Sequence, residues 1–234
     1  MKKDEQVKAY KAFNKDLTCR GFQYEIGKTY EMKGEPIICK RGFHACTELD
    51  DVFMYYKFSK DIRICEVEVL GDIDDMSQKD SKVATNKIKI IRELSVKDLL
   101  ELGGDKSIVQ ASTYGSSLVT DEMIKNLSEL DRIRVVAYGD NLHKNCLVND
   151  ESDDVRFMMA KHGTHEHRDI LLYDVCADVR KRVARYGTTK HQDILVSDDD
   201  WKVRRNVAKY GNDDHRKILM NDKDFRVAKV ALMN

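Results

Sequence analysis

Hydrophobic and polar positions in the second half of the chain recur with a fixed period of 24 residues. Each unit carries two apolar residues four positions apart, such as Val179 and Val183, with an alanine next to the second. This spacing puts the apolar residues on one face of a helix and predicts a short amphipathic α-helix in each unit. A glycine ends each predicted helix, and no insertion interrupts the series Gly115, Gly139, Gly163, Gly187 and Gly211.

Polar residues around each predicted helix repeat with the same period. Asp154, Asp178 and Asp200 stand where they can cap the helix start, and the glycine stands where a left-handed residue often ends a helix. A short polar residue follows each glycine, at Asp140, Thr164, Thr188 and Asn212. A histidine comes three positions later, at His143, His167, His191 and His215. This capping-box spacing predicts a second helical element, and 24 residues leave room only for a short, 3₁₀-like one.

The repeated units resemble those of the leucine-rich repeat variant family, and the segment DDDWKVRRNVAKYGNDDHRKILMND shows the similarity best. The resemblance implies a right-handed helical solenoid in which α- and 3₁₀-helices alternate, with about five units over residues 105–234. The unit around Gly115 departs from the pattern, as a terminal repeat that caps a stack usually does. The prolines usual in that family are absent from these units.

Two further columns of the repeat are candidate binding residues. Arginines recur at Arg132, Arg156, Arg180 and Arg204 and would line one face, where they could bind a phosphate or another partner. Aspartates recur at Asp150, Asp174, Asp198 and Asp222 with the same period, which favours a structural Arg–Asp ladder between layers. The histidine column could bind metal or sense pH, but its position after each cap residue favours a structural role.

Residues 1–100 lack the 24-residue register and predict an α+β domain with a mainly antiparallel sheet. Apolar and polar residues alternate over 7–13, 62–70 and 86–94, and segments on both sides of Gly27 predict a hairpin. Residues 48–58 predict a helix with Val52, Tyr55 and Tyr56 on one face. A capping box at Ser95 opens the next segment, and Gly103–Gly104 is the predicted junction with the repeats.

Cysteine and histidine residues in the first domain are candidate metal ligands. Cys39, His44 and Cys46 could bind zinc together with Cys19 or Cys65. The spacing lacks the tight turn of common zinc modules, and free cysteines are often buried for packing alone. The sequence therefore favours no metal and no other cofactor.

The segments AYKAFNKDLTCRGFQYEIGKTYE and CKRGFHAC resemble an uncharacterised domain family found in bacteriophage and prophage genomes. The resemblance implies a phage or mobile-element accessory protein that acts on host machinery or inhibits host defence. The order of motifs in this half is also similar to that of ADP-ribosyltransferases. Lys11 stands where those enzymes carry an early Arg or His that holds NAD. Gly42–Phe43–His44 and Tyr55–Tyr56 follow in the order that the similarity implies, but Glu66, Glu68 and Glu93 form no clear catalytic motif.

Composition narrows the functional classes. Lysine plus arginine equals aspartate plus glutamate, at 41 each, which argues against an overall electrostatic attraction to nucleic acid or an anionic membrane. Six scattered cysteines suit a reducing compartment, and no apolar run is long enough for a membrane span. We expect a cytoplasmic protein of the host cell, without enzymatic activity, that binds a host or phage protein through its solenoid. An NAD-using transferase, or a degenerate relative of one, and a nucleic-acid-binding solenoid are the alternatives.

Overall fold

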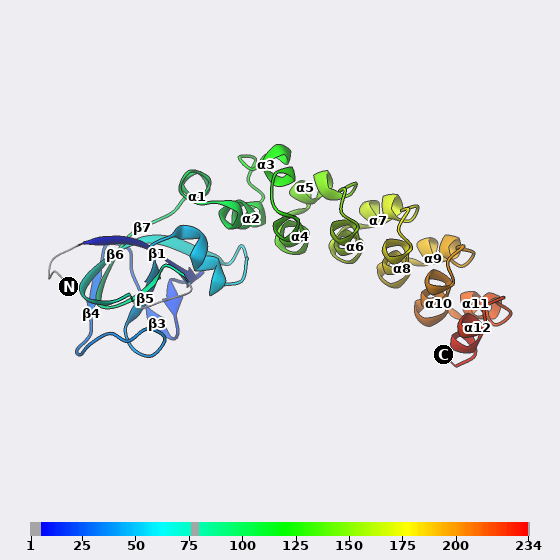
Figure 1. Ribbon diagram of the computed structural model, residues 1–234, viewed down its shortest axis with the longest axis horizontal. Coiled ribbons are helices and arrows are strands. Elements are labelled where there is room, and N and C mark those ends of the chain that lie inside the picture. The colour runs from blue at the N-terminus through cyan, green and yellow to red at the C-terminus, as the bar shows by residue number, and fades with distance from the viewer. Residues whose placement is uncertain (1–5, 76–79, 234) are drawn as a thin grey trace. The chain divides into compact units, whose positions relative to one another are not determined.

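The computed structural model describes residues 6–75 and 80–233. The chain forms two compact units, the first ending at Val119 and the second beginning at Thr120. The first unit contains the antiparallel sheet and two helices, and the second is helical (Figure 1). The predicted antiparallel sheet and the predicted helical second half are both confirmed.

A five-stranded sheet in the order β4-β7-β5-β1-β6 forms the core of the first unit. Its strands are β1 (Val7–Asn14), β4 (Thr29–Glu31), β5 (Phe43–Cys46), β6 (Ile62–Asp74) and β7 (Lys82–Glu93). Strand β6 pairs with β7 as well as with β1, so the sheet closes on itself like a small barrel. Two short strands, β2 (Thr18–Cys19) and β3 (Phe22–Gln23), form a separate hairpin.

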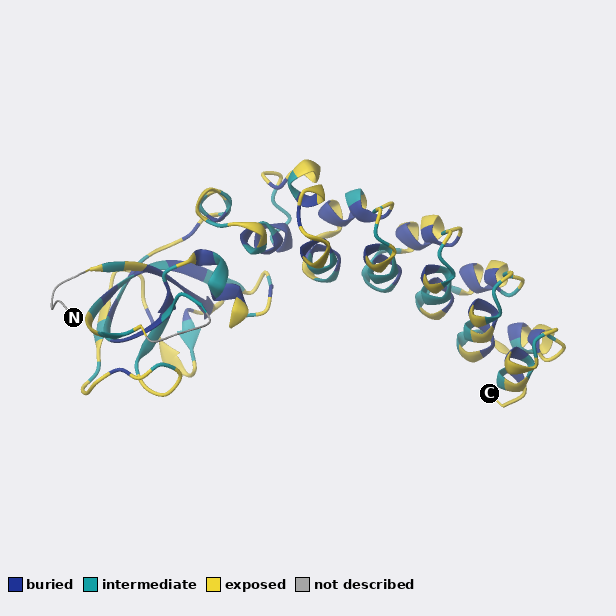
Figure 2. Cartoon of the chain, in the orientation of Figure 1, coloured by how far each residue is buried: buried dark blue, intermediate teal, exposed yellow. Residues whose placement is uncertain are grey.

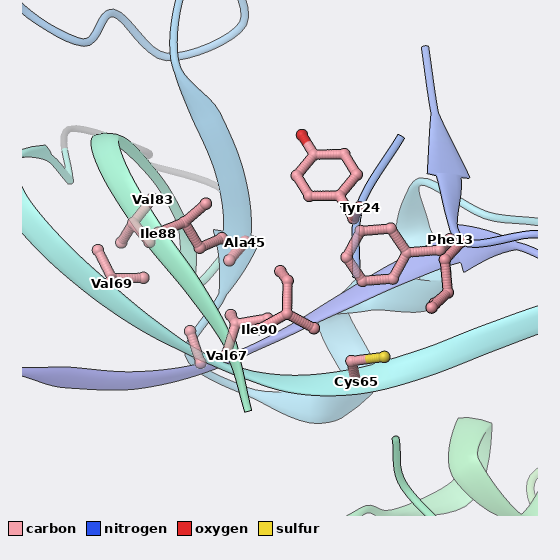
Figure 3. Packing of buried hydrophobic residues seen from close by; sticks show 11 residues of the cluster. Phe13, Tyr24, Ala45, Cys65, Val67, Val69, Val83, Ile88 and Ile90 are labelled. Atoms are coloured by element: carbon pink, nitrogen blue, oxygen red, sulfur yellow. The ribbon is translucent and has the colours of Figure 1, made fainter. Parts of the chain in front are cut away.

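Alternation along β6 places its apolar side chains inside this closed sheet. Cys65, Val67 and Val69 are fully buried, and Glu66 and Glu68 between them are partly exposed. Figure 3 shows these side chains in one cluster with Phe13 and Tyr24, whose ring centroids lie 5.0 Å apart. The alternation predicted from the sequence for this strand is therefore confirmed.

Two local predictions for the first unit were wrong. The segments around Gly27 do not pair with each other, because β3 pairs with β2 and β4 pairs with β7. The amide of Gly27 instead donates to the carbonyl of Ile90, at 2.7 Å. The helix predicted over residues 48–58 is a short 3₁₀ turn, η1 (Leu49–Met54), in which Val52 is buried, and Tyr55 after it is exposed.

Helices α1 (Val96–Leu102) and α2 (Asp105–Thr113) belong to the sheet unit, so the boundary lies later than the predicted junction at Gly103–Gly104. The capping box at Ser95 is present at the start of α1. The carboxylate of Asp50 in η1 accepts hydrogen bonds from the amides of Gly104, Lys106 and Ser107 at 3.0–3.2 Å and so caps α2 from another element. This cap connects the start of α2 to η1.

The second unit consists of short helical elements that follow one another in two rows (Figure 1). We call the row of longer helices the long row and the row of shorter helices the short row. The long row contains α4 (Glu129–Tyr138), α6 (Asp153–His162), α8 (Ala177–Tyr186), α10 (Trp201–Tyr210) and α12 (Phe225–Met233). The short row contains α3 (Asp121–Lys125), α5 (Asn141–Lys144) with η2 (Asn145–Leu147), α7 (His165–Leu171), α9 (Thr189–Leu195) and α11 (Asp213–Leu219). In Figure 2 buried residues cover part of each helix, and residues of intermediate and full exposure cover the rest. Val155, Val179 and Val203 are fully buried, as the apolar spacing predicts.

Details of the predicted units differ from the structure. The second element is a seven-residue α-helix in α7, α9 and α11, and 3₁₀ geometry is confined to η2 within the short row. Asp200 caps α10 as predicted, but Ser152 and Cys176 occupy the corresponding cap positions of α6 and α8. Asp154 and Asp178 therefore lie in the first helical turn, where a negative charge interacts favourably with the helix dipole.

The repeat glycines end α4, α6, α8 and α10, as predicted, but at Gly163, Gly187 and Gly211 the reason for glycine is steric. Gly163, Gly187 and Gly211 have φ between −74° and −76°, which is ordinary extended backbone and not the left-handed region. A Cβ at each of them would come within 2.7 Å of a backbone carbonyl oxygen of the preceding helix. Only Gly115, after α2, has a positive φ, of 67°, among the five glycines of the series.

Candidate functional site

A cavity of about 410 Å³ opens in the sheet unit. Residues from β1, the β2–β3 hairpin, β5, η1 and the start of β7 line it, so closure of the sheet brings together positions from 10 to 82. The motif residues Lys11, Gly42–Phe43–His44 and Tyr55–Tyr56, far apart in the sequence, meet here. The structure thus gathers in one cavity the residues whose order resembles that of the transferases.

Three basic side chains give the cavity a cationic lining. Lys11 is 6% exposed, and its Nζ donates to the carbonyl of His44 at 2.9 Å. Burial lowers the pKa of Lys11, and the nearby Cys19 thiol opposes that shift. A hydrogen bond to Tyr55 raises the pKa of Lys82 and so keeps its ammonium charged. Arg20 completes the set from the turn between β2 and β3, where its φ of 50° and that of 77° at Gly21 fit a tight hairpin turn.

Aromatic rings form much of the remaining wall. Tyr24 and Tyr56 have pKa values raised by burial, so both hydroxyls stay protonated. The Tyr56 hydroxyl lies 3.2 Å from the Cys19 sulfur. Tyr55 hydrogen bonds to Asp80, and its ring lies 4.2 Å from Lys82 Nζ. The cavity therefore combines positive charge with planar apolar surface.

The cysteine and histidine residues proposed as zinc ligands do not gather into a metal site. His44 Nε2 accepts a hydrogen bond from the Cys39 amide at 3.0 Å, so this nitrogen is already used. Burial raises the pKa of the Cys46 thiol to about 12 and that of Cys65 to about 12, which disfavours the thiolate that zinc needs. Across residues 6–75 and 80–233, no three His, Cys, Asp or Glu side chains are placed to hold a metal ion.

The three acidic residues considered for catalysis lie outside the cavity. Glu66 is paired with Lys8 and Arg92, at 3.3 and 3.1 Å. Glu93 is paired with Arg63, whose Nη2 lies 2.6 Å from the carboxylate. No carboxylate is among the described residues that line the cavity. Its chemistry therefore suits binding of an anion and provides no carboxylate for transfer chemistry.

The repeat arginines make bidentate ion pairs with the aspartates 18 positions later. In each pair Nε and Nη2 donate to the two carboxylate oxygens, for example at 2.7 and 3.0 Å between Arg180 and Asp198. The same geometry joins Arg132 to Asp150, Arg156 to Asp174, and Arg204 to Asp222. The guanidinium of Arg180 also donates through Nη1 to the carbonyl of Asp174, so one arginine links two aspartate positions. This geometry supports the structural ladder, and a binding role for the arginines stays a prediction.

The repeat histidines close the capping boxes of the short row. Nδ1 of His167, His191 and His215 accepts from the amide of the cap residue at 2.9–3.1 Å. Because Nδ1 is an acceptor, the ring proton is on Nε2. Nε2 of His167 lies 2.8 Å from Oδ1 of Asn145, and Nε2 of His215 lies 2.8 Å from Oδ1 of Asp193. Nε2 of His191 lies 2.9 Å from Asp169 without the alignment of a hydrogen bond. His143 is buried at the equivalent position of α5.

A column of isoleucines is exposed on the short row. Ile170, Ile194 and Ile218 are 48%, 46% and 59% exposed, and they occupy equivalent positions in α7, α9 and α11. The leucine after each of them is buried. We call these three residues the isoleucine column. Tyr173 and Val175, in the segment after α7, are 72% and 92% exposed and add apolar surface.

Sequence reasoning missed several of these features. The Ile-Leu pairs were visible, but periodicity alone did not show which member points outward. Lys82 joins the cavity through strand pairing at long sequence distance, and Arg20 joins it from the turn of a local hairpin. Neither residue carries a local signal. The tyrosine before the repeat glycine at Tyr138, Tyr186 and Tyr210 was a visible column that was not interpreted.

A family model matches the first part of the chain. No curated protein and no solved structure matches the chain significantly. Within the described residues, no helix is long and apolar enough to cross a membrane. A family model described as a domain of unknown function (DUF7666) matches residues 7–102, which span the sheet and α1 and exclude the helical repeats. The N-terminal part of the chain is therefore similar to this uncharacterised family, DUF7666.

Proposed function

We propose that the protein is a non-enzymatic binding protein whose second unit is a solenoid that holds a partner protein on its short row. The regular Arg–Asp pairs support the solenoid, because the same bidentate contact recurs with the 24-residue period of the units. Repeats stacked in this way present equivalent side chains at regular intervals.

The isoleucine column is the observation that carries this proposal. Three large apolar side chains, each about half exposed, recur at one position of α7, α9 and α11. The leucine beside each one is buried in the core, whereas the isoleucine leaves about half of its surface exposed. Large apolar side chains exposed at equivalent positions of successive repeats favour a protein interface.

The resemblance of the first unit to phage and prophage proteins suggests the partner. A phage or mobile-element accessory protein acts in the cytoplasm of its host, so a host protein is the expected partner. A component of host defence is the first class to examine, with inhibition as the expected effect.

Comparative capture from a bacterial lysate tests this proposal. The full chain is used as bait beside the triple variant Ile170→Ser, Ile194→Ser and Ile218→Ser. The matched control carries Lys202→Ser, Arg205→Ser and Lys229→Ser on the long row, all at exposed positions. We expect a host protein that wild type and control retain and the isoleucine variant loses. Equal capture by all three baits would refute a role for the column.

The cavity supports a second candidate function, binding of NAD by a degenerate relative of the transferases. Its cationic groups suit a pyrophosphate and its rings suit planar bases, and an anion near Lys11 would oppose the desolvation that lowers the pKa of this lysine. At a free concentration one hundred times its Kd, NAD would raise the free energy of unfolding by about 2.7 kcal/mol.

Thermal unfolding with millimolar NAD tests this second function. We expect Tm to rise for the wild type and for Lys217→Gln, a surface change in the other unit, and to rise less for Lys82→Met. An unchanged wild-type Tm would exclude NAD as a ligand of the cavity.

A further inference from the structure

A continuous line of cations and aromatic rings crosses three helices of the long row. The Arg182 guanidinium lies 3.8 Å from the ring centroid of Phe157 on α6 and 5.5 Å from that of Tyr186 on α8. Arg185 lies 5.1 Å from the Tyr186 ring and 5.0 Å from that of Tyr210 on α10, where Lys209 follows at 5.3 Å. We call Phe157, Arg182, Tyr186, Arg185, Tyr210 and Lys209 the cation–aromatic row.

Two of the three helices that carry this row, α8 and α10, have an excess of positive charge, although the whole chain is neutral. Helix α10 contains no acidic residue, and the only one in α8, Asp178, is paired with Lys181. Arg185 and Lys209 have no carboxylate partner among the residues that the structure describes, in contrast to the arginines of the Arg–Asp ladder. Nε of Arg182 is buried and has no hydrogen-bond partner in the same described part. Arg185 and Lys209, both at exposed positions, thus have positive charge available to a ligand.

We propose that the cation–aromatic row binds single-stranded nucleic acid. Its cations would neutralise phosphates, and its tyrosine rings and guanidinium planes would stack against bases. An acidic peptide would need the cations alone, so the interleaved rings favour nucleic acid as the ligand. The proposal goes beyond the proposed function, because it concerns the other row of helices and another class of partner.

Fluorescence anisotropy with the full chain tests this inference. The probes are fluorescein-labelled single-stranded RNA and DNA of mixed sequence, about 20 nucleotides long, which exceeds the site of one binding module. Three phosphate contacts predict an affinity about twenty-fold lower in about 200 mM than in 50 mM salt, from a slope of about −0.7 per contact. No binding at the lower salt would overturn the proposal.

Variants locate the binding. Because Arg182 packs on Phe157, the first variant changes only two exposed cations, Arg185→Gln with Lys209→Gln, and circular dichroism checks its Tm. We expect at least about tenfold weaker binding from two lost phosphate contacts at low salt. The matched control, Lys190→Gln with Lys217→Gln on the short row, should stay within twofold. Equal losses in both variants would overturn the assignment to this row.

A second pair of experiments separates nucleic acid from an acidic protein partner. Tyr210→Leu should weaken oligonucleotide binding about tenfold, since stacking on one ring contributes that much per base. Polyglutamate of matched charge should compete poorly. Unchanged binding by Tyr210→Leu together with efficient competition by polyglutamate would assign the row to acidic peptides and overturn the proposal.

Discussion

Gly187 lies so close to His191 that a Cβ on the glycine would come within 2.9 Å of the histidine Cβ. The same Cβ would lie 2.6 Å from the carbonyl oxygen of Val183. With φ at −75°, the backbone would accept any residue, so lack of space and not conformation requires glycine here. One helix end and the capping box of the next helix thus share a single tight contact in each of these units.

The first prediction concerns that contact. Gly187→Ala should lower the free energy of unfolding by about 1–3 kcal/mol, the usual cost of forcing an extra carbon into a packed site. Thr189→Ala, at an exposed position at the start of α9, is the control and should have a small effect. Urea unfolding at equilibrium measures both. An unchanged midpoint for Gly187→Ala would show that the site relaxes freely and that the steric explanation is wrong.

The second prediction concerns the Arg–Asp ladder. Arg180→Gln should destabilise the protein by about 3 kcal/mol, because Asp198, whose side chain is only 6% exposed, keeps a charge without its bidentate partner. Lys181→Gln removes the neighbouring surface pair with Asp178 and should cost less than about 1 kcal/mol. A double-mutant cycle with Asp198→Asn measures the coupling. Equal effects of the two single substitutions would contradict a structural ladder.

Sequence periodicity predicted the repeat unit well because its signals are local. Valines four apart, a cap residue and a histidine three positions later all act within one helix or one turn, and α8 and α9 form where these signals place them. Gly187 was assigned correctly as a helix end but for the wrong reason. Its constraint comes from the His191 side chain, and a sequence pattern does not report such packing.

The cavity shows where sequence reasoning fails. Lys11 and His44 were singled out from motif order, but their contact depends on β1 pairing with β5. Lys82 enters through β7, whose partners no local pattern specifies. The wrong hairpin at Gly27 has the same origin, since β4 pairs with β7 far along the chain. Long-range strand pairing decides these features, and it leaves little trace in short sequence windows.

The third prediction is a pH dependence of stability that involves His167. Burial first, and then the nearby positive charge of Lys144, lowers the pKa of this histidine in the folded protein. Above the ordinary histidine value of about 6.5 both states are neutral and the stability is complete. As the pH falls below that value the unfolded chain binds a proton first, so stability decreases. Protonation would also break the bond from the Thr164 amide to Nδ1.

Thermal unfolding between neutral and mildly acidic pH checks this dependence. His167→Gln should lose less Tm on acidification than the wild type, because it removes one of the groups with a lowered pKa. His165→Gln, at an exposed position in the same helix, should behave like the wild type. The same loss of Tm in all three proteins would show that His167 does not contribute.

The fourth prediction is that the protein does not turn over NAD, even if the cavity binds it. Transfer chemistry needs a carboxylate that stabilises the developing positive charge, and none of the described residues lining the cavity supplies one. A glycohydrolase and automodification assay compares wild type with Glu66→Gln, Glu68→Gln and Glu93→Gln. Activity of the wild type that any of these substitutions removes would establish an enzyme.

Hydrogen–deuterium exchange of the full chain, alone and with the captured partner, tests the central claim most directly. Binding through the isoleucine column predicts slower exchange in peptides that cover α7, α9 and α11, and little change in the sheet unit. The triple isoleucine variant should show no such protection. Protection confined to the sheet unit or to the long row would contradict the claim that the short row holds the partner.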